Sequence, residues 1–148
     1  MPDATSAFKR QLKDAFAEIQ VGQSYTYRRT FTEGDVALFC GVTGDFNPYH
    51  MDETFASQSW YSRRIIPGLL TGSMLTHIGG MLGFLATEMS FQYLVPVYVH
   101  DTITCTVTFT EKDEARRRLF GSVRYVNQDG AEVLHASFSG FPGQVRLK

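Results

Sequence analysis

The spacing of hydrophobic residues predicts helices in the first half of the chain. Over residues 6–19, apolar side chains recur every three or four positions, which predicts an amphipathic helix. Residues 24–31 alternate between polar and apolar side chains and are rich in β-forming types, which predicts a strand. At Thr32 a capping-box pattern with Asp35 predicts the start of a second helix, which we expect to stop at Gly41.

The longest apolar run predicts a central helix from Pro67 to about residue 86. Proline suits the first turn of a helix, where its missing N–H has no helical partner. Glycine is frequent in this run and costs a helix about 1 kcal/mol relative to alanine, so close packing or access for a ligand must offset it. Because polar residues interrupt the run, a helix enclosed by protein is favoured over a membrane span.

The second half of the chain carries strand patterns. Strands are predicted over 90–99, over 102–111 and on both sides of Asp129-Gly130, a strong hairpin signal. An apolar helix needs burial on every side, and a curved antiparallel sheet covers only part of it. We therefore predict one α+β domain over residues 1–148, with the sheet wrapped around the helix and a second copy of the chain covering the remainder.

Composition and charge narrow the class of protein. The 148 residues are 43% hydrophobic and 20% charged, as in ordinary globular proteins, and the net charge of −1 favours neither nucleic acid nor an anionic membrane. Cys40 and Cys105 lack CxxC spacing and are expected to be buried, reduced thiols. The first residues include acidic side chains and no apolar stretch, so they do not match the pattern of a signal peptide. These features lead us to expect a cytoplasmic protein.

Candidate chemistry is concentrated in residues 45–52, DFNPYHMD. Asp45 and His50 are five positions apart and would diverge on a regular helix, but Pro48 makes a continued helix unfavourable and allows the chain to fold back. A carboxylate and an imidazole around one water molecule can exchange protons near neutral pH. The alternative is a polar loop that merely ends a helix. Asp52 suits the N-cap of a following helix, and a metal site built on these acidic and imidazole groups lacks a further ligand cluster.

The pattern D-x-N-P-x-H-x-D at 45–52 resembles the signature of the MaoC-like dehydratases, or (R)-specific enoyl-CoA hydratases, of the hot-dog fold. Two further segments agree with it. PGLLTGS at 67–73 is similar to the family's H-G-M-L-x-x-S, and PVYVHDT at 96–102 is similar to its P-V-x-x-G-D-T. The resemblance covers residues 24–140, and the helix expected at 6–20 lies outside it.

The resemblance implies a single hot-dog domain that usually forms a dimer. It also implies an enzyme that hydrates trans-2-enoyl thioesters of coenzyme A or acyl carrier protein to (R)-3-hydroxyacyl thioesters, or dehydrates them, with no metal or redox cofactor. By position, Asp45 and His50 match the catalytic pair. Gly68 matches the residue whose backbone N–H faces the thioester carbonyl, Ser73 matches a hydroxyl near the pair, and Asn47 matches a loop amide that shapes the site.

Departures from the family pattern leave two alternatives open. Pro67 replaces a frequent histidine, which bears on the exact substrate, and His100 replaces a turn glycine, which affects a loop more than the chemistry. HIGG at 77–80 loosely resembles the H-G-G of hot-dog thioesterases, so an acyl-CoA hydrolase is one alternative. A non-catalytic acyl-binding or partner subunit of a heterodimer is the other. Arg63 and Arg64 either meet substrate phosphates or belong to a solvated loop.

Overall fold

The computed structural model describes residues 2–142, which form six helices and a five-stranded antiparallel sheet. The helices are α1 (Ser6–Glu18), α2 (Glu33–Thr43), α3 (Pro48–Met51), α4 (Glu53–Ser57), α5 (Gly68–Gly72) and α6 (Leu75–Leu82). The strands are β1 (Ser24–Thr30), β2 (Phe84–Tyr93), β3 (Thr102–Asp113), β4 (Arg118–Val126) and β5 (Glu132–Pro142).

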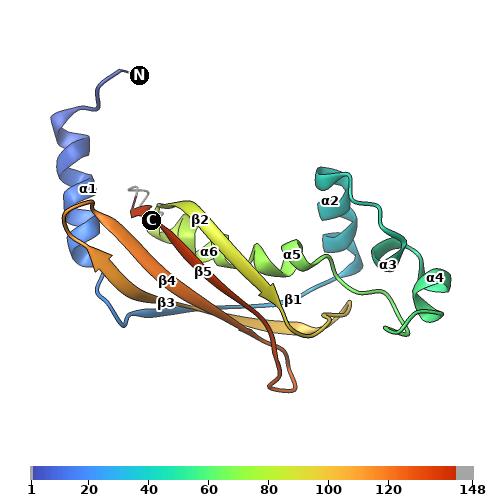
Figure 1. Cartoon of the computed structure of the whole chain (residues 1–148). Coiled ribbons are helices and arrows are strands. Elements are labelled where there is room, and N and C mark those ends of the chain that lie inside the picture. The colour runs from blue at the N-terminus through green and yellow to red at the C-terminus, as the bar shows by residue number, and fades with distance from the viewer. Residues whose placement is uncertain (1, 143–148) are drawn as a thin grey trace.

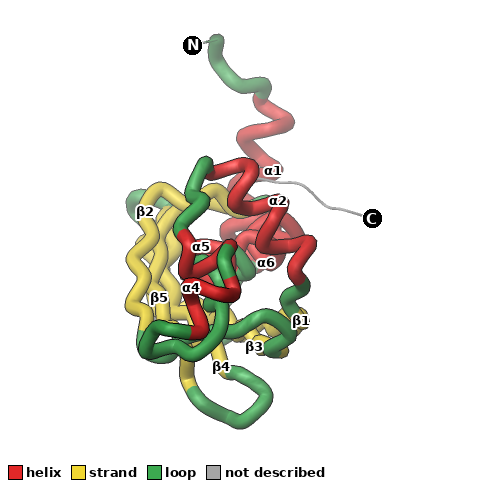
Figure 2. Tube along the Cα trace, turned by 90° about the vertical axis from the view of Figure 1, so that its right-hand side faces the viewer, coloured by secondary structure: helices red, strands yellow, loops and turns green. Residues whose placement is uncertain are grey.

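The sheet has the strand order β1-β3-β4-β5-β2 and curves around α5 and α6. Figure 1 shows α1 at one end of the sheet and α2, α3 and α4 grouped at the other. In the view of Figure 2, α5 and α6 lie inside the curve of the strands. The predicted α+β architecture, a central helical segment wrapped by a curved antiparallel sheet, is confirmed.

The core lies between the concave face of the sheet and the helices. The inward positions expected on β3 are almost fully buried, namely Ile103, Cys105, Val107 and Phe109. Cys40 and Cys105 are buried free thiols, as predicted. Burial raises the pKa of Cys105 to about 12, so this thiol stays protonated at neutral pH.

The central helix predicted over 67–86 is wrong in its extent. The apolar run contains α5 and α6, separated at Ser73 and Met74, and its last three residues begin β2. Gly83 ends α6 in the left-handed conformation, with φ of 62°. The residues after Gly83 pair with β5 and complete the sheet. A short apolar run fits a buried strand as well as a buried helix, so periodicity does not mark this boundary.

Two other predicted boundaries are wrong. The strand expected over 90–99 continues only to Tyr93, and the following segment is irregular apart from one bridge between Ile65 and Tyr98. Pro96 in this segment has no N–H to offer a neighbouring strand. The second helix passes Gly41 and ends at Gly44, whose φ is 73°. A helix stops where the left-handed conformation is adopted, and a glycine alone does not impose it.

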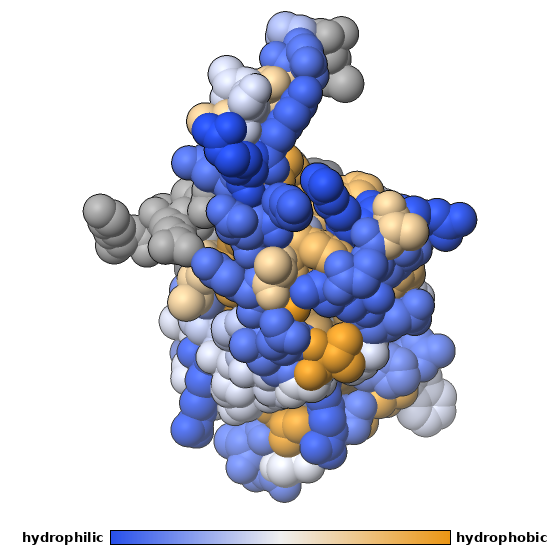
Figure 3. All heavy atoms as spheres, turned by 90° about the vertical axis from the view of Figure 1, so that its left-hand side faces the viewer, coloured by the Kyte–Doolittle hydropathy of each residue, from blue (hydrophilic) through white to orange (hydrophobic). Residues whose placement is uncertain are grey.

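The remaining local predictions are confirmed. Thr32 and Asp35 form the reciprocal capping box at the start of α2. Asp129 and Gly130 lie in the turn that joins β4 to β5, and Gly130 has a φ of 81°. The amphipathic α1 packs Phe16 into the core, while the face of the molecule that carries α1 is largely hydrophilic (Figure 3). Within residues 2–142, no helix combines the length and the apolar character needed to cross a membrane.

Candidate active site

The loop after α2 is held by a series of hydrogen bonds between residues close in sequence. The N–H of Gly44 donates to the Cys40 carbonyl at 2.8 Å and closes α2. The N–H of Asp45 then donates to Oγ1 of Thr43 at 3.1 Å. The N–H of Asn47 donates to Oδ1 of Asp45 at 3.2 Å. These local bonds replace the helical ladder, so the chain turns sharply and positions the Asp45 carboxylate at the turn.

Asn47 and Pro48 start the next helix and fix the position of His50. Oδ1 of Asn47 accepts from the N–H of Tyr49 at 3.2 Å and caps α3, and Pro48 occupies its first position. His50 follows two residues later. Asp52 caps α4 by accepting from the N–H of Phe55 at 3.0 Å, which is the N-cap role that the sequence predicts for it.

His50 is buried, with 9% of the residue's surface exposed, and the orientation of its ring is fixed by one hydrogen bond. Nδ1 lies 2.7 Å from the carbonyl oxygen of Ile65, while the N–H of Ile65 donates to the Tyr49 carbonyl at 3.1 Å. A carbonyl oxygen only accepts, so Nδ1 must carry the proton. In the neutral ring this leaves a lone pair on Nε2, the atom that faces Asp45.

Asp45 and His50 converge, as the sequence predicts. Nε2 of His50 lies 3.8 Å from Oδ2 of Asp45, whose side chain is half exposed. This separation is too long for a direct hydrogen bond and allows one oxygen atom to contact both groups. The arrangement can therefore remove a proton from a water molecule at this point and return a proton to a neighbouring atom.

His50 lines a cavity of about 490 Å³ that also contains the start of α5. The cavity wall includes Gly68, whose N–H has no hydrogen-bond partner among residues 2–142. A Cβ at Gly68 would lie 2.6 Å from the Tyr93 ring, so only glycine fits there without displacing the ring. The rest of the wall is mainly apolar, with Tyr61, Ile65, Ile66, Leu69, Thr71, Tyr93, Leu94, Val95, Pro96, Val97, Val133 and Leu134.

Several residues of this wall were not expected from the sequence. Thr71 lies in the apolar run and carries no motif of its own, although it is three residues after Gly68 and so shares its helical face. The segment from Leu94 to Val97 was predicted as part of a strand, and it instead forms irregular backbone that lines the cavity. Burial raises the pKa of Tyr93, which keeps its hydroxyl neutral.

Ser73 is not brought together with His50 in this chain. Ser73 lines a second hollow, of about 470 Å³, and its Oγ donates to the Leu70 carbonyl at 2.6 Å. His77 lines the same hollow and is exposed, with its ring stacked on Tyr27 at a centroid distance of 3.9 Å. His77, the histidine that motivated the hydrolase alternative, therefore lies in a hollow whose lining does not include His50.

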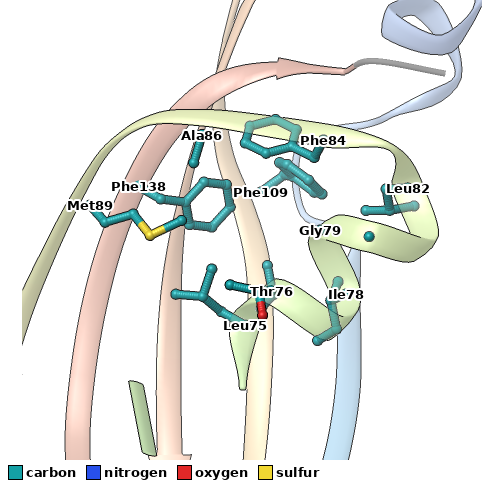
Figure 4. Close-up of a pocket in the computed structure, with 12 residues that line it drawn as sticks. Leu75, Thr76, Ile78, Gly79, Leu82, Phe84, Ala86, Met89, Phe109 and Phe138 are labelled. Atoms are coloured by element: carbon teal, nitrogen blue, oxygen red, sulfur yellow. The ribbon is translucent and has the colours of Figure 1, made fainter. Parts of the chain in front are cut away.

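A third, smaller cavity of about 90 Å³ lies between α6 and the sheet (Figure 4). Phe84, Phe109 and Phe138 point into it, and Thr76 is the polar side chain in its lining. It holds no acidic or imidazole group, so it does not provide acid–base chemistry. Among the described residues, no three side chains of the histidine, cysteine, aspartate and glutamate types gather closely enough to hold a metal ion.

The two arginines after α4 have different surroundings. Arg64 forms ion pairs with Glu33 of α2 and Glu53 of α4, and so joins the helices on both sides of the site loop. Partial burial of the guanidinium works against its charge, but the two carboxylates raise the pKa of Arg64. Arg63 is exposed and lies over the Tyr98 ring at 4.0 Å from its centre. Arg64 is thus a structural brace, and Arg63 remains open to an anionic group.

The two departures from the family pattern have simple structural consequences. His100 adopts a φ of 73°, the left-handed conformation that glycine enters freely, which explains why glycine suits this turn. Pro67 is the N-cap of α5, one residue before the helical turn expected for it, and makes no side-chain cap bond. At the start of α5, no side chain therefore caps the helix, and Gly68 is the first residue that offers a backbone N–H.

Residues 16–131 match the family described as "MaoC like domain". The chain therefore belongs to the MaoC-like family. Among curated relatives, it is 33% identical over 99 residues to the (R)-specific enoyl-CoA hydratase of Rhodospirillum rubrum, covering 64% of this chain and 69% of the relative. It is 30% identical over 117 residues to the (R)-specific enoyl-CoA hydratase of Aeromonas caviae, covering 76% and 87%.

Solved structures agree with this assignment. The unliganded R-hydratase PhaJ1 from Pseudomonas aeruginosa superposes with a TM-score of 0.81 at 26% identity, covering 88% of this chain and 86% of that one. The (R)-hydratase from A. caviae gives a TM-score of 0.81 at 28% identity, covering 84% and 98%. The predicted hot-dog fold and family are confirmed.

Proposed function

We propose that this protein is a hydro-lyase that adds water to trans-2-enoyl thioesters to give (R)-3-hydroxyacyl thioesters, or catalyses the reverse dehydration. The observation that carries the proposal is the pairing of Asp45 with Nε2 of His50 at 3.8 Å, with Nδ1 of the same ring bonded to the Ile65 carbonyl. His50 also lines a large, mainly apolar cavity that could hold an acyl chain. Relatives named as (R)-specific enoyl-CoA hydratases support the same reaction.

In the proposed reaction, a water molecule lies between Asp45 and His50 and gives one proton to the pair. Its oxygen forms a bond to C3, and the electrons of the C2–C3 double bond move toward the thioester oxygen. The pair then returns one proton to C2, so that protons and electrons balance. An acid or base group placed in this way typically contributes about 10²–10⁴-fold in rate.

The Gly68 N–H is proposed to hold the thioester oxygen as negative charge develops on it. This N–H is free of other partners among the described residues, and Gly68 lines the same cavity as His50. A donor aimed at a developing oxyanion is worth about 10²–10³-fold in rate. Asn47 supports the site by shaping the loop through its cap on α3. A catalytic role for Ser73 stays a prediction, because Ser73 lines the other hollow and its hydroxyl donates to the Leu70 carbonyl.

The proposed activity is tested by mixing the purified protein with crotonyl-CoA and with longer trans-2-enoyl-CoA thioesters. Loss of the absorbance of the conjugated thioester and formation of the (R)-3-hydroxyacyl product are expected. Release of free thiol without hydration would support a hydrolase instead. Absence of turnover across the chain-length series would contradict the proposal and favour an acyl-binding role.

We also propose that the functional unit contains two copies of the chain. Strand β2 ends the sheet among the described residues. Leu85, Met89 and Tyr93 on β2 are exposed, and so are Leu94 and Val95 after it. A strand edge flanked by exposed apolar side chains is a surface that a partner commonly covers.

The oligomeric state is measured by sedimentation equilibrium. We expect twice the mass of one chain, and we expect Leu85→Glu to weaken the dimer because it places a charge on the proposed contact surface. Phe8→Glu, a change at an exposed apolar residue of α1, is the matched control and should leave the mass unchanged. A wild-type mass equal to one chain would exclude this proposal.

The proposed substrate is an acyl group on a phosphorylated carrier, and the proposed location is the cytoplasm. The carrier is coenzyme A or acyl carrier protein, both of which bring a phosphorylated pantetheine arm; Arg63 is a candidate contact for its phosphates. A cytoplasmic location is in keeping with the two unpaired thiols.

A further inference from the structure

Thr71 carries a buried hydroxyl without a partner. Only 1% of its surface is exposed, and its Oγ1 has no hydrogen-bond partner within the part of the chain that the structure describes. The same residue lines the cavity that contains His50 and Gly68. A buried hydroxyl without a partner is unfavourable, so a group that enters the cavity with a hydrogen-bond acceptor would relieve that cost.

The usual helical partner of a threonine hydroxyl is already occupied. In helices, Thr side chains often donate to the carbonyl four residues earlier, which for Thr71 is that of Pro67. This carbonyl accepts from the N–H of Leu70 at 3.0 Å and from the N–H of Thr71 itself at 3.3 Å. Both lone pairs of the Pro67 oxygen are therefore used, and the hydroxyl of Thr71 remains free to donate elsewhere.

Thr71 and Gly68 lie on one face of α5. Residues three apart are neighbours on a helix surface, and a helical side chain leans back over the turn before it. By this rule the Thr71 side chain leans toward the turn that contains Gly68, where the Tyr93 ring packs against the glycine. Two unused donors, the hydroxyl of Thr71 and the N–H of Gly68, thus share one part of the cavity wall.

We propose that the Thr71 hydroxyl and the Gly68 N–H together bind the thioester oxygen, and that Thr71 is the second donor to the charge that develops on it. This inference rests on the proposed function. The hydrocarbon part of an acyl chain offers no acceptor, and the reacting oxygen at C3 is held by Asp45 and His50. The thioester oxygen is the remaining acceptor near the reacting carbons.

The apolar surroundings make this donor more effective. The same cavity wall contains Ile66, Val97, Val133 and Leu134. A hydrogen bond in such a low-dielectric setting is stronger than the same bond in water, and a donor fixed in advance needs no reorganisation as charge forms.

The test uses Thr71→Val and Thr71→Ser in the full chain, with crotonyl-CoA as substrate. T71V keeps the shape and removes the hydroxyl, and we expect kcat to fall about 10²–10³-fold with KM within about threefold, because the charge exists mainly in the transition state. T71S keeps the hydroxyl, so its kcat should stay within about fivefold of the wild-type value. That change is smaller than the loss expected when a donor is missing. The melting temperature of T71V should equal or exceed that of wild type, since no folded-state hydrogen bond is lost.

The outcomes separate this inference from the proposed function. If wild type turns over and T71V keeps kcat within about threefold, too little for a lost oxyanion donor, the role of Thr71 is excluded. An equal loss in T71S and T71V would also exclude it, because shape rather than the hydroxyl would then matter. If T71V does not fold, Thr71→Ala is measured against T71S by the same criteria. An inactive wild type would overturn the proposed function, and this inference with it.

Discussion

Replacing Asp45 with asparagine is expected to lower kcat for hydration of crotonyl-CoA by about 10²–10⁴-fold. Asparagine has the same shape, and its side-chain oxygen can still accept from the N–H of Asn47, so the loop should keep its structure. What is lost is the negative oxygen that faces Nε2 of His50. Steady-state kinetics with the purified variant provide the measurement.

His50→Asn is the companion change. The asparagine amide can donate to the Ile65 carbonyl in place of Nδ1, while nothing replaces Nε2. We expect a loss of the same size as for D45N. The double variant should be little worse than either single variant, because groups that act as one unit are strongly non-additive.

The matched control is Asp52→Asn, in the same motif. Asp52 caps α4, and asparagine caps a helix about as well as aspartate. Activity and melting temperature should therefore stay near wild type. An equal loss of activity in D52N and D45N would show that the negative charge of the loop matters, and not a specific catalytic role of Asp45. Full activity in D45N would exclude Asp45 from the mechanism.

Gly68→Ala is expected to lower kcat/KM by about 10²–10³-fold. The new methyl group would lie 2.6 Å from one carbon of the Tyr93 ring and 2.9 Å from another, so the ring must move within the cavity. The methyl also stands beside the N–H proposed to bind the thioester oxygen. Alanine favours a helix over glycine by about 1 kcal/mol, which partly offsets the cost of moving the ring, so the melting temperature should change little.

Gly41→Ala provides the comparison for this variant. Gly41 is also helical, but a Cβ there would meet nothing within 4 Å. We expect G41A to keep wild-type activity and to be slightly more stable. Retention of wild-type kcat/KM by G68A would show that the start of α5 does not contact the reacting thioester.

The sequence predicts the fold class well because the strongest patterns are local. The alternation along β3 and the Asp-Gly turn before β5 are read directly from side-chain period and turn chemistry. The failure lies in the apolar run after Pro67. There the end of α6 depends on Gly83, which turns the chain. The start of β2 depends on its pairing with β5, which lies far away in the sequence.

The candidate site is predicted in part for the same reason. Asp45, Asn47 and His50 lie in one short motif, and their local hydrogen bonds produce the convergence that the proline in this motif suggests. Thr71 carries no motif. Its importance appears only when the Pro67 carbonyl is seen to be fully occupied and the hydroxyl is seen to be buried.

The most direct measurement is a crystal structure with the unreactive substrate analogue butyryl-CoA. We expect the acyl group in the cavity lined by His50, with C2 and C3 beside the gap between Asp45 and His50. The thioester oxygen should lie within hydrogen-bond distance of the Gly68 nitrogen. An acyl group bound instead in the hollow lined by Ser73 and His77, away from the Asp45–His50 pair, would contradict the account.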